Sequence, residues 1–168
     1  MINNLFKINL TEEITGITID SRKVEKGDLF IPLKGNLVDG HNYVSNAIEN
    51  GASLVFSEID FKKKSDKVIR VKSTKNAMID LAKNWRNKFD GEILGITGSN
   101  GKTTTKELIG HILSQNINCQ YSKGNHNNTI GMPMTLMSFN PDCELTVLEM
   151  GSNSPGEITF LCEIAHPT

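Results

Sequence analysis

Short apolar runs alternate with stretches of helical periodicity along the first half of the chain. Four runs have the length and the β-branched or aromatic content of strands: residues 17–19, 29–33, 54–56 and 68–71. Residues 43–50 repeat apolar positions at helical spacing, and Gly51 follows where a glycine commonly ends a helix. A longer helix is predicted from Ser73 or Thr74 to Phe89. Its predicted core side chains are Ala77, Met78, Leu81, Ala82, Trp85 and Phe89.

The second half changes to strands that are followed by glycine turns and helices. The predicted order is strand 92–97, turn 98–101, helix 102–114, strand 118–122, a helix opening at Met132, strand 145–148 and a helix opening at residues 155–157. The apolar face of helix 102–114 is predicted to be Leu108, Ile109, Ile112 and Leu113. Such alternation predicts parallel sheets and two α/β domains, residues 1–90 and 91–168.

Charge and composition exclude several classes of protein. The 168 residues carry a formal net charge of −1, without the basic excess of a nucleic-acid-binding protein. The basic run at residues 62–64 is therefore interpreted as a solvated loop. No apolar stretch approaches the roughly 18 residues of a transmembrane helix, and the first residues do not resemble a signal peptide. Three cysteines without a Cys-x-x-Cys pair favour reduced thiols in the cytoplasm.

The segment between the predicted strand and helix at residues 92–114 has the features of a phosphate-binding loop. Glycines let backbone N–H groups approach phosphate oxygens, and a helix N-terminus adds partial positive charge. A lysine there can reach the β- and γ-phosphates, and the next hydroxyl can bind Mg²⁺. Ile96 replaces the first glycine of the strict pattern, so a variant loop is predicted; the alternative is a chance Gly-Lys-Thr. The predicted nucleotide-binding residues are Gly98, Ser99, Asn100, Gly101, Lys102, Thr103 and Thr104.

Several motifs resemble those of the Mur ligases, the amino-acid-adding enzymes of peptidoglycan synthesis. Residues 96–105, with the sequence ITGSNGKTTT, resemble the ATP loop of that family. Residues 124–136 (GNHNNTIGMPMTL) and 149–158 (EMGSNSPGEI) resemble two further segments of its central domain. In the first half, the segments that resemble the UDP-binding domain are residues 20–22, 27–30, 35, 39–41 and 51–52.

The resemblance implies a fold and an activity. The fold would be a small α/β UDP-binding domain followed by the first part of a parallel-sheet P-loop domain. The activity would be ATP-dependent joining of D-alanyl-D-alanine to a UDP-N-acetylmuramoyl-tripeptide through an acyl phosphate, with ATP and Mg²⁺, by a cytoplasmic monomer. The family has three domains, and the later parts of its active site have no counterpart in these residues, so this chain alone is expected to be inactive.

Roles for individual residues follow from the resemblance and from position. Lys102 and Glu149 are the expected catalytic residues, and Thr103 and Glu149 the expected Mg²⁺ ligands. Glu149 follows the apolar run 145–148, and ligands of open α/β sheets bind at the carboxyl ends of strands. The alternative for Glu149 is an ordinary carboxylate at the end of a strand, and the alternative for Lys102 is the chance Gly-Lys-Thr named above.

The expected substrate contacts are Ser21 and Arg22 for the UDP portion and Asn127 and Asn128 for substrate or nucleotide. The Arg22 guanidinium could form bidentate hydrogen bonds to a diphosphate, or it could form a surface salt bridge. The two asparagines could instead form an Asx turn beside Gly124. His41 is left open between a structural role and a substrate contact. The remaining histidines, His111 and His166, are expected to be surface or packing residues.

Two other functions remain open at this point. The chain could bind a UDP-sugar or nucleotide without ligating anything. It could also belong to a neighbouring Mur ligase that adds a single amino acid. A panel of substrates separates the second alternative from the first choice.

Overall fold

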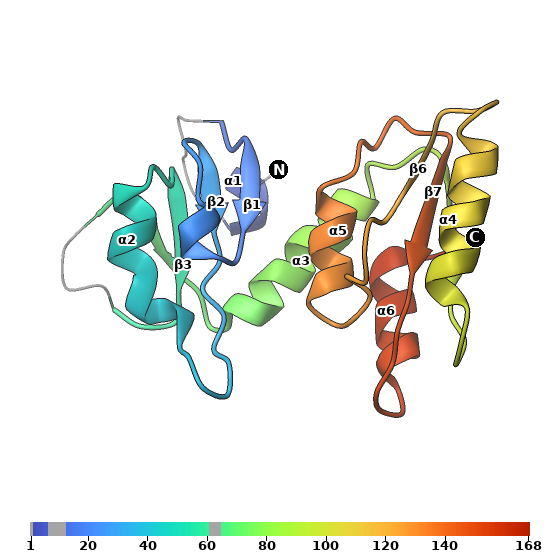
Figure 1. The fold of residues 1–168 in the computed structure, drawn as a ribbon. Helices are drawn as coiled ribbons and strands as arrows, with labels where there is room; N and C mark the ends of the chain where they lie inside the picture. Colours follow the sequence, from blue (N-terminus) through green and yellow to red (C-terminus); the bar gives the residue numbers. More distant parts are fainter. Residues whose placement is uncertain (1, 7–12, 61–64) are drawn as a thin grey trace. The chain divides into compact units, whose positions relative to one another are not determined.

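The computed structural model describes residues 2–6, 13–60 and 65–168. The chain forms two compact units, one ending at Leu81 and one beginning at Ala82 (Figure 1). Each unit is an α/β layer structure built on a parallel sheet, which confirms the predicted fold class. The predicted solvated loop at residues 62–64 lies outside the described residues. None of the helices in the described part of the chain has the length and hydropathy of a bilayer-spanning segment.

The first unit contains a four-stranded parallel sheet in the order β1-β2-β3-β4. Its elements in chain order are α1 (Ile2–Phe6), β1 (Gly16–Thr18), η1 (Ser21–Lys23), β2 (Asp28–Phe30), η2 (Gly40–Tyr43), α2 (Val44–Glu49), β3 (Leu54–Ser57), β4 (Val68–Arg70) and the first turns of α3 (Thr74–Arg86). The predicted strand 29–33 is shorter than expected, because Pro32 has no N–H to continue the ladder. Helix α1 was not predicted from the sequence.

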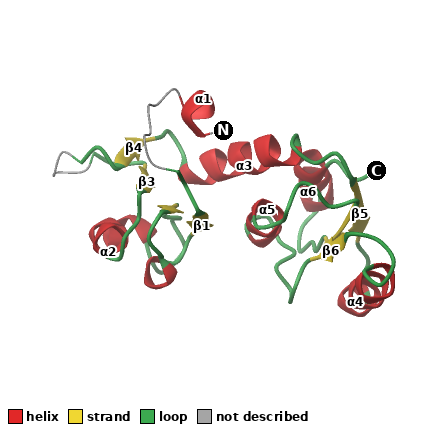
Figure 2. Ribbon diagram, turned by 90° about the horizontal axis from the view of Figure 1, so that it is seen from above, coloured by secondary structure: helices red, strands yellow, loops and turns green. Residues whose placement is uncertain are grey.

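The two faces of this sheet are covered by different helices (Figure 2). Successive strand residues point to opposite faces, so Val55 and Phe56 of β3 enter different layers. The Phe56 ring lies 4.6 Å from the ring of Phe6 in α1. The layer beneath α2 is formed by Val24, Phe30, Val44, Ala47, Ala52 and Val55. Burial of these apolar side chains, at about 25 cal/mol per Å², stabilises the packing of α2 on the sheet.

The second unit contains a three-stranded parallel sheet in the order β5-β7-β6. Its elements, after the end of α3, are β5 (Glu92–Ile96), α4 (Lys102–Leu113), β6 (Cys119–Tyr121), α5 (Gly131–Met137), β7 (Leu145–Glu149) and α6 (Glu157–Ala165). Helix α4 covers one face of this sheet, and α5 and α6 cover the other (Figures 1 and 2). The register pairs Ile96 with Glu149, so the ends of β5 and β7 lie side by side.

The buried face of α4 differs from the one predicted. Leu108 and Ile112 were expected to be core, but each is 58% exposed. The helix instead turns Lys106 and Gly110 inward, toward β6 and β7. A side chain at Gly110 would collide with the Tyr121 ring, at 2.3 Å from the added Cβ. The periodicity correctly predicted a helix here. The close approach of Tyr121 to Gly110 determines which side of the helix packs against the sheet.

The division between the units falls inside helix α3, before the seam predicted at residues 90 and 91. The last turn of the helix is bound to the second unit. The Trp85 indole N–H donates to the carbonyl of Phe139, and Arg86 donates to the carbonyls of Ala165 and His166. Within α3, Ala77, Met78, Leu81 and Ala82 are buried as predicted. The helix ends at Arg86 rather than at the predicted Phe89, which is buried just beyond it.

Candidate functional site

The loop between β5 and α4 has the backbone shape that its glycines permit. Gly98 has a φ of 148° and Gly101 a φ of 76°, conformations that L side chains rarely adopt. Gly101 is the N-cap of α4 and carries no side chain to accept a hydrogen bond from the first N–H groups of that helix. Those donors, with the positive end of the helix dipole, face the loop and are suited to an anion.

Lys102 lies in the first turn of α4 and closes this loop. Its Nζ donates to the carbonyl oxygen of Gly98 at 2.7 Å. The ammonium group is therefore held over the loop rather than extended into solvent. The remaining donors of the ammonium group can reach a phosphate bound at the helix N-terminus.

Glu149, the last residue of β7, pairs in register with Ile96, the last residue of β5 before this loop. It is 2% exposed. Its Oε1 accepts a hydrogen bond from Asn127 Nδ2 at 2.7 Å. Among the described residues, Glu149 Oε2 is the buried side-chain oxygen without a hydrogen-bond partner. An orphaned buried carboxylate oxygen costs free energy unless something positive compensates for it.

The two asparagines that were predicted to contact substrate have different environments. Asn127 is bonded to Glu149 and lines the cavity described below. Asn128 Oδ1 accepts hydrogen bonds from the backbone N–H groups of Ile130 and Gly131 at 3.0 and 2.7 Å, at the start of α5. These two hydrogen bonds are those of an Asx turn, which was the alternative to a substrate contact for the asparagines. A substrate role for Asn128 stays a prediction, and its side chain already has a structural one.

Lys106 is a functional candidate that the sequence analysis missed. Its side chain is fully buried on the inner face of α4. The ammonium Nζ lies 3.7 Å from Glu149 Oε2 and 3.1 Å from Glu107 Oε1, and it donates to the carbonyl of Gly124 at 3.0 Å. Lysines are almost never fully buried unless they are paired. A lysine three residues after a Gly-Lys-Thr sequence was the available signal.

Lys102, Asn127 and Glu149 converge on one cavity of about 390 Å³, whereas Lys106 and Asn128 are not among its lining residues. The residues that line it are Ser99, Asn100, Gly101, Lys102, Thr103, Thr104, Asn125, Asn127 and Glu149. The cavity thus combines helix N–H donors and a lysine on one side with a carboxylate on the other. Such a set can hold a polyphosphate together with its counter-cation.

The residues present fit a magnesium ion. Hard divalent cations prefer carboxylate, hydroxyl and phosphate oxygens. The orphaned Oε2 of Glu149 is an unused carboxylate oxygen, and the Thr103 hydroxyl lines the same cavity. No cluster of three or more His, Cys, Asp or Glu side chains suited to a metal occurs among the described residues. With Glu149 and Thr103 as its protein ligands, a cation here would complete its coordination with oxygens of a bound phosphate.

Ser21 and Arg22 belong to η1 in the first unit and do not line this cavity. Arg22 forms a two-pronged ion pair with Asp20, through Nε to Oδ1 at 2.9 Å and Nη2 to Oδ2 at 2.8 Å. The guanidinium hydrogen bond lowers the pKa of the Asp20 carboxyl to about 2. The surface salt bridge named as an alternative is thus present, and a diphosphate would have to share or replace Asp20. Whether Ser21 and Arg22 bind UDP stays a prediction.

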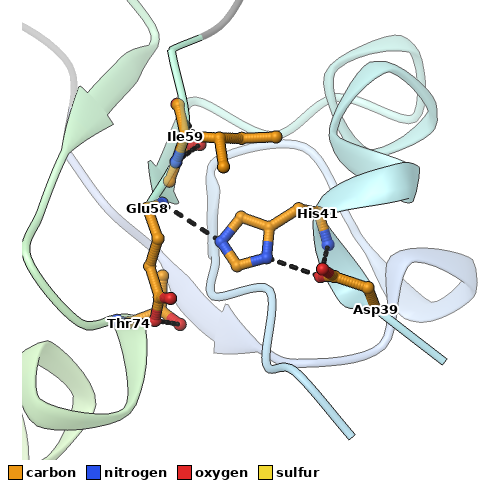
Figure 3. A network of polar contacts seen from close by, with 6 residues as sticks. Asp39, His41, Glu58, Ile59 and Thr74 are labelled. Atoms are coloured by element: carbon orange, nitrogen blue, oxygen red, sulfur yellow. Dashed lines mark hydrogen bonds and ion pairs between the residues drawn. The ribbon is translucent and has the colours of Figure 1, made fainter. Parts of the chain in front are cut away.

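His41 joins two segments of the first unit through both ring nitrogens (Figure 3). Nδ1 lies 2.6 Å from Asp39 Oδ1, and Nε2 accepts the backbone N–H of Glu58 at 3.1 Å. Glu58 Oε1 in turn accepts from the N–H and hydroxyl of Thr74 at the start of α3. These hydrogen bonds lower the pKa of both Asp39 and Glu58. With its ring nitrogens occupied, His41 has a structural role.

Comparison with known proteins places both units in one family. The model named Mur ligase family, catalytic domain, matches residues 13–86, and the model named Mur ligase middle domain matches residues 96–168. A curated relative from Synechocystis sp., named UDP-N-acetylmuramoyl-tripeptide–D-alanyl-D-alanine ligase, is 40% identical over 164 residues. The match covers 95% of this chain and 36% of that relative, so the chain spans about a third of the relative's length.

Solved structures agree with the sequence comparisons. A crystal structure of MurF from Acinetobacter baumannii matches 99% of this chain with a TM-score of 0.90 and 32% identity, over 38% of its own length. The MurF ligase from Thermotoga maritima in complex with ADP matches 90% of this chain with a TM-score of 0.82 and 34% identity, over 35% of its own length.

Proposed function

Because this chain belongs to the Mur ligase family, we propose that it supplies the precursor-binding and nucleotide-binding parts of an ATP-dependent ligase. The ligase joins D-alanyl-D-alanine to a UDP-N-acetylmuramoyl-tripeptide in peptidoglycan synthesis. It acts in the cytoplasm as a monomer and is required for cell-wall growth, and hence for cell shape and division.

The observation that carries the proposal is the convergence of three groups on one cavity. Lys102, Thr103 and Glu149 come from two elements of the second unit and line the same space at the N-terminus of α4. A polyphosphate is bound by an ammonium group, here Lys102, and through a cation held by oxygen ligands, here Thr103 and Glu149. The N–H groups at the start of α4 add helix donors to this set. The name of the Thermotoga maritima relative, which includes ADP, supports a nucleotide at this site.

The proposed reaction needs a carboxylate to be activated. A peptide carboxylate attacks the γ-phosphate of ATP, ADP leaves, and an acyl phosphate forms. The amine of D-alanyl-D-alanine then attacks the acyl carbon, an amide bond forms and inorganic phosphate leaves. Both reactants of the first step are anions, so positive charge must offset their repulsion. A bound Mg²⁺, when present, supplies part of that charge.

The residues of this chain have defined tasks in that scheme. Lys102 neutralises charge that develops on the β- and γ-phosphates. The N–H groups of residues 99–104 orient the phosphates from the end of α4. Thr103 and Glu149 hold Mg²⁺, and Asn127 fixes the orientation of the Glu149 carboxylate through its 2.7 Å hydrogen bond.

The first unit is proposed to bind the UDP portion. Its four strands are parallel, so the segments that follow them share one edge of the sheet. Ser21 and Arg22 follow β1 at this edge, and His41 lies in the segment after β2. In this proposal Arg22 leaves its ion pair with Asp20 and binds the diphosphate instead. The hydrogen bonds of His41 stabilise the conformation of this edge of the sheet.

A chimera tests this function and its specificity. Residues 1–168 replace the matching part of MurF from Acinetobacter baumannii, and ATP-dependent phosphate release is measured with UDP-N-acetylmuramoyl-tripeptide. We expect release with D-alanyl-D-alanine and little with single amino acids. The same chimera carrying Lys102→Ala is the control and should be inactive.

Two results of this assay would argue against the proposal. A preference for a single amino acid over D-alanyl-D-alanine would assign the chain to a neighbouring ligase. A folded chimera that binds the nucleotide and the UDP precursor but releases no phosphate with any acceptor would favour a non-catalytic binding role.

A further inference from the structure

Lys106 and Glu149 are a buried pair of opposite charge whose charged groups do not form a hydrogen bond with each other. Lys106 is fully buried and Glu149 is 2% exposed, and the ammonium lies 3.7 Å from Oε2. That distance is too long for a hydrogen bond, and Oε2 has no hydrogen-bond partner in the part of the chain that the structure describes. The ammonium is therefore close enough to neutralise the carboxylate electrostatically but leaves the lone pairs of Oε2 unused.

The ammonium is held in place by groups other than Glu149. It donates to the carbonyl of Gly124 at 3.0 Å and lies 3.1 Å from the carboxylate of Glu107. These two contacts hold the Lys106 ammonium in position when a second cation approaches Oε2. In a buried site a fixed positive charge repels a divalent cation strongly, because little water screens the two.

We propose that Lys106 is a built-in counter-ion that prevents Glu149 from binding a divalent cation until a nucleotide is present. The proposal rests on the proposed nucleotide-binding function. The phosphates bring several negative charges into the cavity, and these outweigh the repulsion from the single ammonium. Metal and nucleotide then bind together, and the empty site does not take up free Mg²⁺.

The test uses Mn²⁺, which accepts the same oxygen ligands as Mg²⁺ and gives an electron paramagnetic resonance signal when free. Mn²⁺ binding is measured without nucleotide at about pH 8, where exposed carboxyl groups are ionised. Lys106→Met keeps the length of the side chain and removes its charge. We expect its Kd for Mn²⁺ to be at least about tenfold lower than that of the wild type.

Two further variants make the test specific. Lys123→Met removes a nearby exposed lysine that does not line the cavity, and its Kd should be unchanged. Combining Lys106→Met with Glu149→Gln should abolish the gain, because the carboxylate that binds the metal is gone. Persistence of the gain in this double variant, through Glu107 for example, would contradict the proposal. Far-UV circular dichroism checks that each variant is folded.

The wild type gives an independent test that needs no variant. It should bind Mn²⁺ far more tightly with ATP than without, and equal affinities would overturn the inference. An unchanged Kd in folded Lys106→Met, with ATP binding intact, would overturn it as well and leave the proposed function standing. The proposed function fails separately. It fails if the wild type binds ATP neither in the presence of a metal chelator nor with metal supplied.

Discussion

Replacing Lys102 with alanine should weaken ATP binding by about 30- to 150-fold, or about 2–3 kcal/mol, the range for a charge-assisted hydrogen bond to a phosphate. The side chain closes the loop over Gly98 and lines the cavity. Removing it takes away the ammonium group that offsets phosphate charge. The Kd for ATP, measured by isothermal titration calorimetry on both chains, gives the effect directly.

Stability should change little in this variant. Lys102 is partly exposed, and its hydrogen bond within the loop is local. Lys123→Ala serves as the matched control, since this exposed lysine is outside the cavity, and it should bind ATP like the wild type. Unchanged ATP affinity in a folded Lys102→Ala chain would remove the phosphate-loop assignment.

Replacing His41 with alanine should destabilise the first unit by about 2–4 kcal/mol. The imidazole is buried, and its removal leaves a cavity. It also leaves the N–H of Glu58 without its acceptor and Asp39 without its 2.6 Å partner (Figure 3). The free energy of unfolding from urea denaturation, followed by far-UV circular dichroism, measures the loss. Exposed His111, replaced in the same way, should cost almost nothing.

The same network makes the first unit sensitive to acid. The hydrogen bonds from His41 hold the pKa of Asp39 below its ordinary value of 3.8, and those from Thr74 hold that of Glu58 below 4.5. A carboxyl with a lowered pKa in the folded state stabilises it above the ordinary value, and this contribution is lost as the pH falls through the lowered one. Unfolding free energy should therefore fall below about pH 4.5, and less steeply in His41→Ala. Equal slopes would contradict the Asp39 contribution.

The parts of the site that could be predicted are those encoded locally. The glycine loop lies between a strand and a helix in the sequence itself, and Glu149 directly follows its apolar strand. Parallel pairing then brings the ends of β5 and β7 together, which makes the meeting of Lys102, Thr103 and Glu149 predictable.

Other features depend on contacts between distant segments, which periodicity cannot identify. Lys106 has the sequence appearance of a surface residue, and its partner Glu149 lies far along the chain. The inward side of α4 is determined by the approach of Tyr121 to Gly110, so Leu108 and Ile112 remain exposed although their spacing is that of a core face. The position of the unit boundary inside α3 likewise follows from Trp85 and Arg86, whose partners come later in the chain.

The most direct test of the account is a calorimetric titration of the wild-type chain with ATP, with and without Mg²⁺. We predict saturable binding at one site that becomes tighter when Mg²⁺ is present, because Glu149 and Thr103 contribute only through the cation. A folded chain that gives no binding heat under conditions where a known ATP-binding protein does, and no displacement of a fluorescent nucleotide, would contradict the central claim. So would binding whose affinity is the same with and without Mg²⁺.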